Sequence, residues 1–262
     1  MEYALITGAS SGIGLELASI MAEKGHHLIL VARREDILLE KKAAWEKAFG
    51  IRVETCSMDL SVPGQAQKLY DFCRARELQV GILVNNAGYG DYGQFATEKL
   101  ETYRNMLQLN VLALTELTAL FIKDMKQRNS GRIMNIGSLA AFLPAPNLAV
   151  YAASKAYVMH FTEALNFELR GTGVSATSLN PGVTETGFVS RAGMAAASVV
   201  RMGVMDARTV AMHGYQAMMS GSLNRVPGWK NKISAFASMT APSREMLLRI
   251  AGFVFRNADK PA

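Results

Sequence analysis

Strand-like and helix-like segments alternate from the first residues of the chain to about residue 180, and few folds accommodate such a pattern. Short runs rich in Val, Ile and Leu are separated by longer stretches with apolar residues at helical spacing. The predicted strands are residues 3–7, 27–32, 52–58, 81–84, 132–136 and 175–179, and the predicted helices between them are residues 14–24, 35–49, 64–76, 100–127 and 151–170. Repeated units of this kind predict an α/β fold, a doubly wound parallel sheet with helices on both faces.

The length of 262 residues suits one α/β domain, so we predict a single domain over residues 1–262. After Pro181 the sequence becomes rich in small residues and Met, and residues 206–220 and 245–256 have helical spacing. We expect residues 185–262 to form a substrate lid and a helical C-terminal extension that caps the sheet. The last helix is amphipathic, and it can pack on the domain, on a twin subunit or on a membrane surface. Packing within the chain is the alternative we favour.

Composition and spacing argue against several classes of protein. The chain is 50% apolar and 19% charged, as a globular protein is, and its apolar runs are shorter than the ~20 residues of a membrane span. The net charge of +6 comes from scattered side chains, so no nucleic acid is expected as a partner. The four histidines lack a ligand spacing such as HExxH, so no metal is expected. Because the residues before the first strand lack an export signal and the two cysteines lack a CxxC spacing, we expect reduced thiols and a cytoplasmic protein.

A glycine-rich turn, TGASSGIG, covers residues 7–14 between the first predicted strand and the first predicted helix. Backbone N–H groups and the helix dipole can hold a pyrophosphate at such a place. Gly8 permits the tight turn, Gly12 lets the backbone approach the phosphates, and Gly14 lets the helix lie close to the sheet. The spacing is GxxxGxG rather than GxGxxG, so a turn without a ligand remains an alternative. We predict a Rossmann-type dinucleotide site whose turn residues are Gly8, Ser10, Ser11, Gly12, Ile13 and Gly14.

Two arginines, Arg33 and Arg34, follow the second predicted strand. In NAD-binding proteins a carboxylate stands at about this distance from the glycine-rich turn and binds the ribose 2′-hydroxyl. A guanidinium there can instead clamp a 2′-phosphate, which favours NADP(H). Two alternatives remain: the arginines are solvated surface residues, or Glu35 and Asp36 bind the ribose after a small shift of register.

Tyr151 and Lys155 stand four residues apart on a predicted helix, which places both side chains on one face. Ser138 follows the neighbouring predicted strand. An ammonium close to a phenol favours the phenolate, and a serine hydroxyl can hydrogen-bond a substrate carbonyl. Such an arrangement transfers protons, although each residue taken singly is as compatible with packing or solvation.

The chain resembles the short-chain dehydrogenases/reductases over about residues 3–185. Residues 7–14 are similar to the TGxxxGxG turn of that family, residues 85–88 (NNAG) to its NNAG motif, and residues 151–155 (YAASK) to its YxxxK motif. Asn110, Ser138 and the Pro181-Gly182 pair match the helical asparagine, the serine and the PG turn of the family in the same order. No catalytic position is substituted, so the resemblance implies an active enzyme.

The resemblance also implies a role for each matched residue. Tyr151 would donate or accept the proton, Ser138 would polarise the carbonyl, Lys155 would bind the nicotinamide ribose and tune Tyr151, and Asn110 would hold a water in a proton relay. The remaining cofactor-binding residues would be Asp59, Leu60, Asn86, Ala87, Gly88, Pro181, Gly182, Val183 and Thr184. From the residues alone, Asp59 as a cap and Asn86 as a turn residue remain alternatives.

The segments expected to contact the substrate are residues 187–205, 142–147 and 89–95, which are apolar and aromatic. They suit an apolar ketone, an aldehyde or a 3-oxoacyl compound, unless they only pack among themselves. After residues 225–228 the sequence continues with helical spacing, unlike the short strand and Gly-rich tail common in the family, which puts tetramers in doubt. We expect a homodimer through residues 100–127 and 151–170. Two functions remain: an NADP(H)-dependent carbonyl reductase, which the intact Asn110, Ser138, Tyr151 and Lys155 favour, and a dinucleotide-sensing binding protein.

Overall fold

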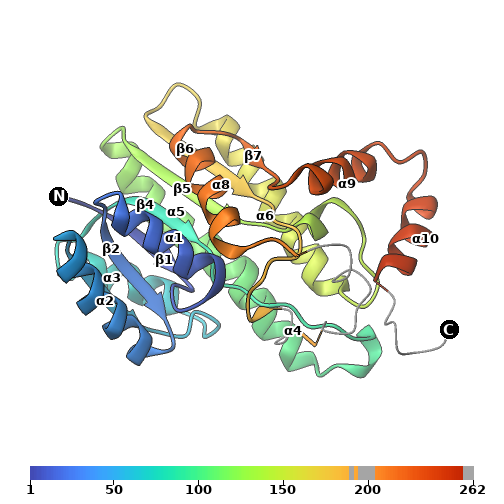
Figure 1. Ribbon diagram of the computed structural model, residues 1–262, viewed down its shortest axis with the longest axis horizontal. Helices are drawn as coiled ribbons and strands as arrows, with labels where there is room; N and C mark the ends of the chain where they lie inside the picture. Colours follow the sequence, from blue (N-terminus) through green and yellow to red (C-terminus); the bar gives the residue numbers. More distant parts are fainter. Residues whose placement is uncertain (189–191, 194–203, 256–262) are drawn as a thin grey trace.

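A seven-stranded parallel sheet runs through the residues that the computed structural model describes, which are 1–188, 192–193 and 204–255 (Figure 1). The strand order is β3-β2-β1-β4-β5-β6-β7. The strands are β1 (Glu2–Thr7), β2 (His27–Ala32), β3 (Val53–Ser57), β4 (Gln79–Asn85), β5 (Gly131–Ile136), β6 (Val174–Leu179) and β7 (Asn224–Arg225). The order reverses between β1 and β4, and a crevice for a ligand opens at such a reversal beyond the carboxyl ends of the strands. The predicted doubly wound α/β fold is therefore confirmed.

Helices cover both faces of the sheet because its central strands are apolar on both sides. In β1, Ala4 and Ile6 pack on one face while Tyr3 and Leu5 pack on the other. The first face is covered by α1 (Gly12–Glu23), α2 (Glu35–Phe49) and α8 (Ala207–Met219), and the second by α3 (Gln65–Ala75), α5 (Leu114–Gln127) and α6 (Ala149–Glu168). The two faces together form the core that fixes the strand ends.

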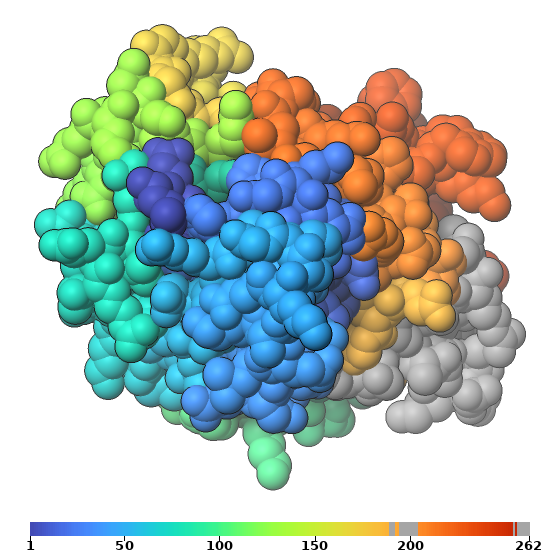
Figure 2. All heavy atoms as spheres, turned by 60° about the vertical axis from the view of Figure 1, so that its left-hand side comes forward, coloured from blue at the N-terminus to red at the C-terminus, as the bar shows by residue number. Residues whose placement is uncertain are grey.

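Helices α1 and α8 lie side by side although they are far apart in the sequence (Figure 2, blue against orange). The guanidinium of Arg208 on α8 contacts the carboxylates of Glu23 at 2.7 Å and Glu16 at 3.5 Å on α1. Beneath this pair, Leu17 and Val210 are fully buried in the same apolar cluster. The segment after β6 thereby closes back onto the first helix of the fold.

The long helix predicted over residues 100–127 is interrupted. It consists of α4 (Leu100–Leu107), a π-helical segment (Gln108–Ala113) and α5. A π turn adds one residue without breaking the apolar stripe, so hydrophobic spacing alone does not reveal it. The whole run, Leu100–Gln127, has the length and the mean hydropathy, 1.4, of a possible membrane span, the single such helix in the described part of the chain. Its buried side chains Leu117, Phe121 and Met125 belong to the sheet core, as those of a core helix do.

The C-terminal region differs from the prediction in one element. Strand β7 has two residues, too few to produce a recognisable pattern, and the sequence analysis missed it. Two further helices, α9 (Trp229–Met239) and α10 (Arg244–Val254), follow β7 and stand beside the edge of the sheet (Figure 1, right). Short 3₁₀ turns at Phe95–Thr97 and Leu139–Phe142 complete the described elements.

Candidate active site

A cavity of about 1400 Å³ opens beyond the carboxyl ends of the strands. All but two of the predicted site residues line it, namely Gly8, Ser10, Ser11, Gly12, Ile13, Arg33, Arg34, Asp59, Leu60, Asn86, Ala87, Gly88, Ser138, Tyr151, Lys155, Pro181, Gly182, Val183 and Thr184. The two exceptions, Gly14 and Asn110, lie behind its wall. Residues more than 140 positions apart in the sequence thus share one cavity.

The glycine-rich turn is held against the NNAG segment by a network of hydrogen bonds. The Thr7 hydroxyl accepts from the backbone N–H groups of Asn86 and Ala87, each at 3.0 Å, and the Asn86 amide donates to the Thr7 carbonyl at 2.9 Å. Gly8 and Gly12 have φ of 69° and 56°, which a side chain would strain. A Cβ on Gly14 would reach the Gly8 carbonyl oxygen at 2.5 Å. Gly14 therefore allows α1 to pack closely on the turn.

Both arginines after β2 lie at the same end of the cavity. The Arg34 guanidinium donates to the carbonyl and hydroxyl oxygens of Ser10 at 2.8 and 3.0 Å, and Arg33 contacts Asp59 at 3.4 Å. Glu35 and Asp36 form the exposed first turn of α2 and are not among the residues that line the cavity. The geometry therefore presents two guanidinium groups, rather than a carboxylate from this segment, to a ligand on the turn.

Asp59 both lines the cavity and stabilises its own turn. Its carboxylate accepts hydrogen bonds from the backbone N–H and the hydroxyl of Ser61 at 3.0 and 2.7 Å. Partial burial acts to raise the pKa of Asp59, but the Ser61 hydrogen bonds and the Arg33 charge outweigh it and lower the pKa. Asp59 thus stabilises its own turn, which was the alternative considered from the sequence, and it also lies at the cavity wall.

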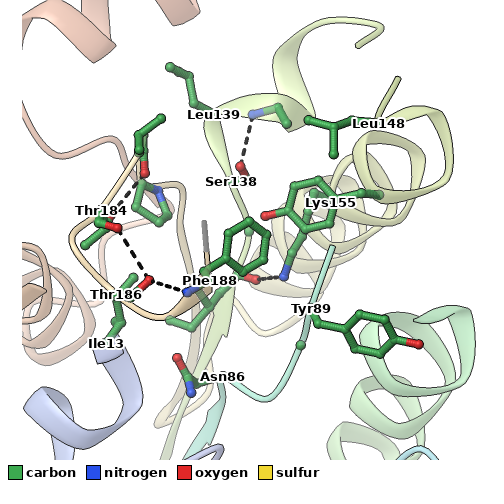
Figure 3. A pocket seen from close by; sticks show the side chains of 18 of the residues that line it. Ile13, Asn86, Tyr89, Ser138, Leu139, Leu148, Lys155, Thr184, Thr186 and Phe188 are labelled. Carbon is green, nitrogen blue, oxygen red and sulfur yellow. Dashed lines mark hydrogen bonds between the residues drawn. The ribbon is translucent and has the colours of Figure 1, made fainter. Parts of the chain in front are cut away.

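Ser138, Tyr151 and Lys155 meet in one buried corner of the cavity, around which Figure 3 shows Ser138, Lys155 and Phe188. The Lys155 ammonium donates to the carbonyl of Ile136 at 2.7 Å and lies 5.8 Å from the centre of the Tyr151 ring. Tyr151 is 8% exposed and Lys155 is 5% exposed, so both ionisable groups are shielded from water.

Burial governs the proton affinities of this corner. It raises the pKa of Tyr151 to about 12, against a hydrogen bond with Ser138 that acts to lower it. Burial also lowers the pKa of Lys155 to about 8. The tyrosine is therefore a protonated phenol near neutral pH, and the lysine carries its charge below about pH 8.

Ser138 is oriented by its neighbours. Its hydroxyl accepts from the backbone N–H of Ala140 at 3.1 Å, and its own backbone N–H donates to the side chain of Asn180 at 3.1 Å. Asn180 is completely buried at the end of β6 and also donates to Asn224 of β7 at 3.0 Å. Asn180 is a positioning residue that the sequence analysis missed, because a single buried asparagine next to a PG turn carries no spacing signal.

Asn110 lies inside the π-helical segment and is buried. Its amide donates to the Tyr89 carbonyl at 2.9 Å and to the Ser154 hydroxyl at 3.1 Å, and its oxygen accepts from the Tyr89 N–H at 3.1 Å. These bonds tie the irregular segment after the NNAG motif to α6 next to Lys155. The side chain fixes the cavity wall from behind, and the water-binding role implied by the resemblance stays a prediction.

Two backbone hydrogen bonds hold the start of the segment after the PG turn. The backbone N–H groups of Glu185 and Met205 donate to the carbonyls of Met205 and Val183 at 2.8 and 3.0 Å. Phe188 then turns its ring over Tyr151, with 5.3 Å between the ring centres. Most of the predicted lid, residues 187–205, lies outside the described residues; the part that is described closes one side of the corner.

The C-terminal helices form a cavity wall that the sequence analysis did not predict. Asn231 on α9 packs beneath the PG turn, where a Cβ on Gly182 would reach its amide at 2.6 Å. The other lining residues from this region are Lys230, Ser234, Ala237, Ser238, Thr240, Ala241, Pro242, Met246, Leu247, Ile250 and Phe255. The apolar spacing of these helices was visible in the sequence, but nothing in it indicated that they face the cavity.

The cavity fits a dinucleotide. The glycine-rich turn has no Cβ at the two positions of positive φ, and cationic groups stand beside it for phosphate groups. Over residues 1–188, 192–193 and 204–255, no group of three or more His, Cys, Asp or Glu side chains is arranged to hold a metal ion.

Comparison with known proteins connects this geometry to a family. A model of the short chain dehydrogenase family matches residues 2–196. The chain is similar to the very-long-chain 3-oxoacyl-CoA reductase of Rattus norvegicus, with 32% identity over 186 residues that cover 69% of this chain and 58% of the relative. It is also similar to sulfoacetaldehyde reductase 2 of Chromohalobacter salexigens, with 37% identity over 71% of this chain and 74% of the relative. The match thus spans less than two thirds of the length of the first of these relatives.

Solved structures agree with the sequence comparisons. A short-chain dehydrogenase from Sphingobium yanoikuyae in complex with NADPH is 30% identical, with a TM-score of 0.82 over 100% of this chain and 99% of that chain. The L-sorbose reductase of Gluconobacter frateurii, complexed with NADPH and L-sorbose, is 26% identical, with a TM-score of 0.75 over 85% of this chain and 93% of that chain.

Proposed function

Because the chain belongs to the short-chain dehydrogenase family, we propose that it transfers a hydride between NADP(H) and a carbonyl or alcohol substrate. The observation that carries the proposal is the buried corner where Ser138, Tyr151 and Lys155 converge at the wall of a cavity large enough for a dinucleotide and a substrate. Two relatives whose names describe them as reductases support the same class of reaction.

The preference for NADP(H) rests on Arg33 and Arg34. Both guanidinium groups line the cavity at the end near the glycine-rich turn, and Arg34 is already held on that turn by Ser10. A 2′-phosphate would receive charge-assisted hydrogen bonds there. The Sphingobium yanoikuyae dehydrogenase, which was solved with NADPH, is consistent with this choice.

In the proposed reaction, bound NADP(H) would supply the hydride to the carbonyl carbon or accept it from the alcohol. Ser138 hydrogen-bonds the carbonyl oxygen, and Tyr151 donates the one proton that this oxygen needs as the C–O double bond becomes a single bond. The high pKa of Tyr151 keeps the phenol protonated before reduction. The Lys155 charge then stabilises the phenolate that remains, and a proton from solvent restores the phenol.

The substrate that fits the corner is apolar. Leu139, Leu143, Leu148 and Phe188 stand around the Tyr151 ring or along the wall beside it. We propose an apolar ketone, an aldehyde or a 3-oxoacyl compound, since such a wall favours burial of hydrocarbon next to the carbonyl.

The test is oxidation of NADPH and of NADH across a panel of apolar ketones, aldehydes and 3-oxoacyl thioesters, followed by the absorbance of the reduced nicotinamide. Turnover with NADPH should fall at least about a hundredfold in Tyr151→Phe, in line with the loss of a general acid. The matched control is Tyr157→Phe on the same helix, where the hydroxyl contacts only Thr115 among the described residues. NADPH binding without turnover on the whole panel would support the alternative function, a dinucleotide-sensing protein.

We further propose a homodimer in the cytoplasm. Exposed apolar side chains Leu112 and Phe167 lie on the helical run 100–127 and on α6, the surfaces expected to pair. Cys56 and Cys73 are both unpaired thiols, as proteins of reducing compartments have. Light scattering should give twice the chain mass, and the mass of a monomer would contradict the proposed dimer. Cell fractionation should recover the protein from the cytoplasmic side, and a secreted protein would contradict the proposed location.

A further inference from the structure

Helices α9 and α10 expose an unusually apolar face, which we call the outer face. On α9 it consists of Trp229, Ile233, Phe236 and Met239, which recur at helical spacing, and on α10 of Met246, Ile250 and Phe253. The exposed fractions of Trp229, Phe236 and Phe253 are 68%, 68% and 74%. Aromatic side chains so accessible on adjacent helices indicate a surface that is covered when the protein works.

The inner sides of α9 and α10 pack against the rest of the protein. Ala235 of α9 and Leu247 and Ala251 of α10 are buried, and Asn231 contacts the PG turn. Phe236 and Phe253 therefore face outward because the opposite sides of their helices are already packed. Burial within the described chain does not account for the outer face.

Basic side chains accompany the outer face. Between Trp229 and Ile250 the chain has four basic residues, Lys230, Lys232, Arg244 and Arg249, and one acidic residue, Glu245. The single carboxylate is paired with Arg249 at 2.6 Å. Amphipathic helices with aromatic residues on one side and lysines at its border are typical of protein segments that lie in the interface of an anionic bilayer.

The charge pattern distinguishes between two candidate occupants of the outer face, a second copy of the chain and an anionic lipid bilayer. In a symmetric dimer the same patch would meet itself, so Lys230 and Lys232 of both copies would border one apolar contact. Like charges there would repel, whereas anionic headgroups would compensate them while the aromatic rings enter the acyl boundary.

We propose that the outer face of α9 and α10 docks on the surface of an anionic lipid bilayer. The exposed area and the charge of this face do not depend on the proposed reaction. Met246 and Ile250 belong both to the outer face and to the cavity wall, so the docked surface includes the rim of the cavity. If the proposed function holds as well, an apolar substrate dissolved in the bilayer would enter at that rim.

The test is flotation of the full chain with vesicles of phosphatidylcholine alone or with roughly one third phosphatidylserine. We expect binding to the anionic vesicles to be at least about tenfold stronger, and the double variant Phe236→Ser/Phe253→Ser to lose at least about tenfold of it. The matched control is Phe49→Ser, since Phe49 at the end of α2 is also an exposed aromatic residue, at 41%, but lies outside the outer face and outside the proposed dimer surface. The control should bind as the unchanged protein does.

A second readout needs no variant that alters the outer face. Trp229 is exposed while the other tryptophan, Trp45, is 9% exposed, so anionic vesicles should shift the fluorescence emission of Trp229 to shorter wavelength. Absence of the shift, or equal binding to both vesicle types, overturns the proposal. So does a fall in molar mass by light scattering in the Phe236→Ser/Phe253→Ser variant without vesicles, because a second copy would then be the occupant.

Discussion

The buried ammonium of Lys155 makes the stability of the fold depend on pH, and the substitution Lys155→Met should remove that dependence. In the folded chain, burial lowers the pKa of Lys155 to about 8, whereas the ordinary value is 10.5. Between these two pH values the unfolded chain binds more protons than the folded chain. The free energy of unfolding must therefore rise with pH in this window.

The size of the effect follows from the two pKa values. Each unit of difference corresponds to about 1.4 kcal/mol, and most of the window is crossed between about pH 7 and about pH 9.5. Relative to Lys155→Met, the unchanged protein should gain about 2 kcal/mol in the free energy of unfolding over this range. No reduction for solvent screening applies, because Lys155 is 5% exposed.

The assay is urea unfolding without added cofactor at a series of pH values, for the unchanged protein, for Lys155→Met and for a control, Lys126→Met. Lys126 is an exposed lysine near the end of α5, so its variant should follow the unchanged protein at every pH. Parallel curves for the unchanged protein and Lys155→Met would refute the reasoning, since Lys155 would then titrate alike in both states. A difference that falls with pH would refute its sign.

Three further substitutions test other parts of the structure. Arg34→Leu should raise the dissociation constant for NADPH roughly tenfold or more and that for NADH less than about threefold, as measured by nucleotide fluorescence. An equal rise for both nucleotides would show that Arg34 does not bind the 2′-phosphate. Gly14→Ala should lower the free energy of unfolding by about 1–3 kcal/mol, because the new Cβ would press on the Gly8 carbonyl. The control is Gly252→Ala, which should not lower the free energy of unfolding, since its Cβ would meet nothing within 4 Å. Arg208→Ala should cost no more than about 1 kcal/mol in urea unfolding, since its ion pairs with α1 are partly exposed, and a larger loss would mean that these pairs hold α8 in place.

The sequence predicted those parts of the protein that depend on local patterns. Strands such as β1 and β2 are apolar at most positions, and the turn at residues 7–14 and the spacing of Tyr151 and Lys155 fix their neighbours within a few residues. These features led to the fold and to residues that the structure brings to one cavity. The catalytic roles of those residues await the tests described above.

The remaining features depend on contacts between distant segments. The π-helical segment preserves the apolar stripe of the helix around it, and β7 is stabilised by its pairing with β6 rather than by its own two residues. Asn180 acts through the backbone of Ser138, and Asn231 acts through the close approach of Gly182. The residue type alone does not indicate either contact. The same holds for the cavity wall formed by α9 and α10.

The two halves of the cavity differ in how much of the fold depends on them. The half formed by the turn, the NNAG segment and α6 is continuous with the sheet core, so most changes there also disturb folding. In α9 a single side chain, Ala235, is buried, and in the described side chains of α10 only Leu247 and Ala251 are. Substitutions on these helices can thus reshape what the cavity admits at little cost in stability. Selection for a new substrate would find its tolerated mutations there, while the chemistry of the corner is inherited unchanged.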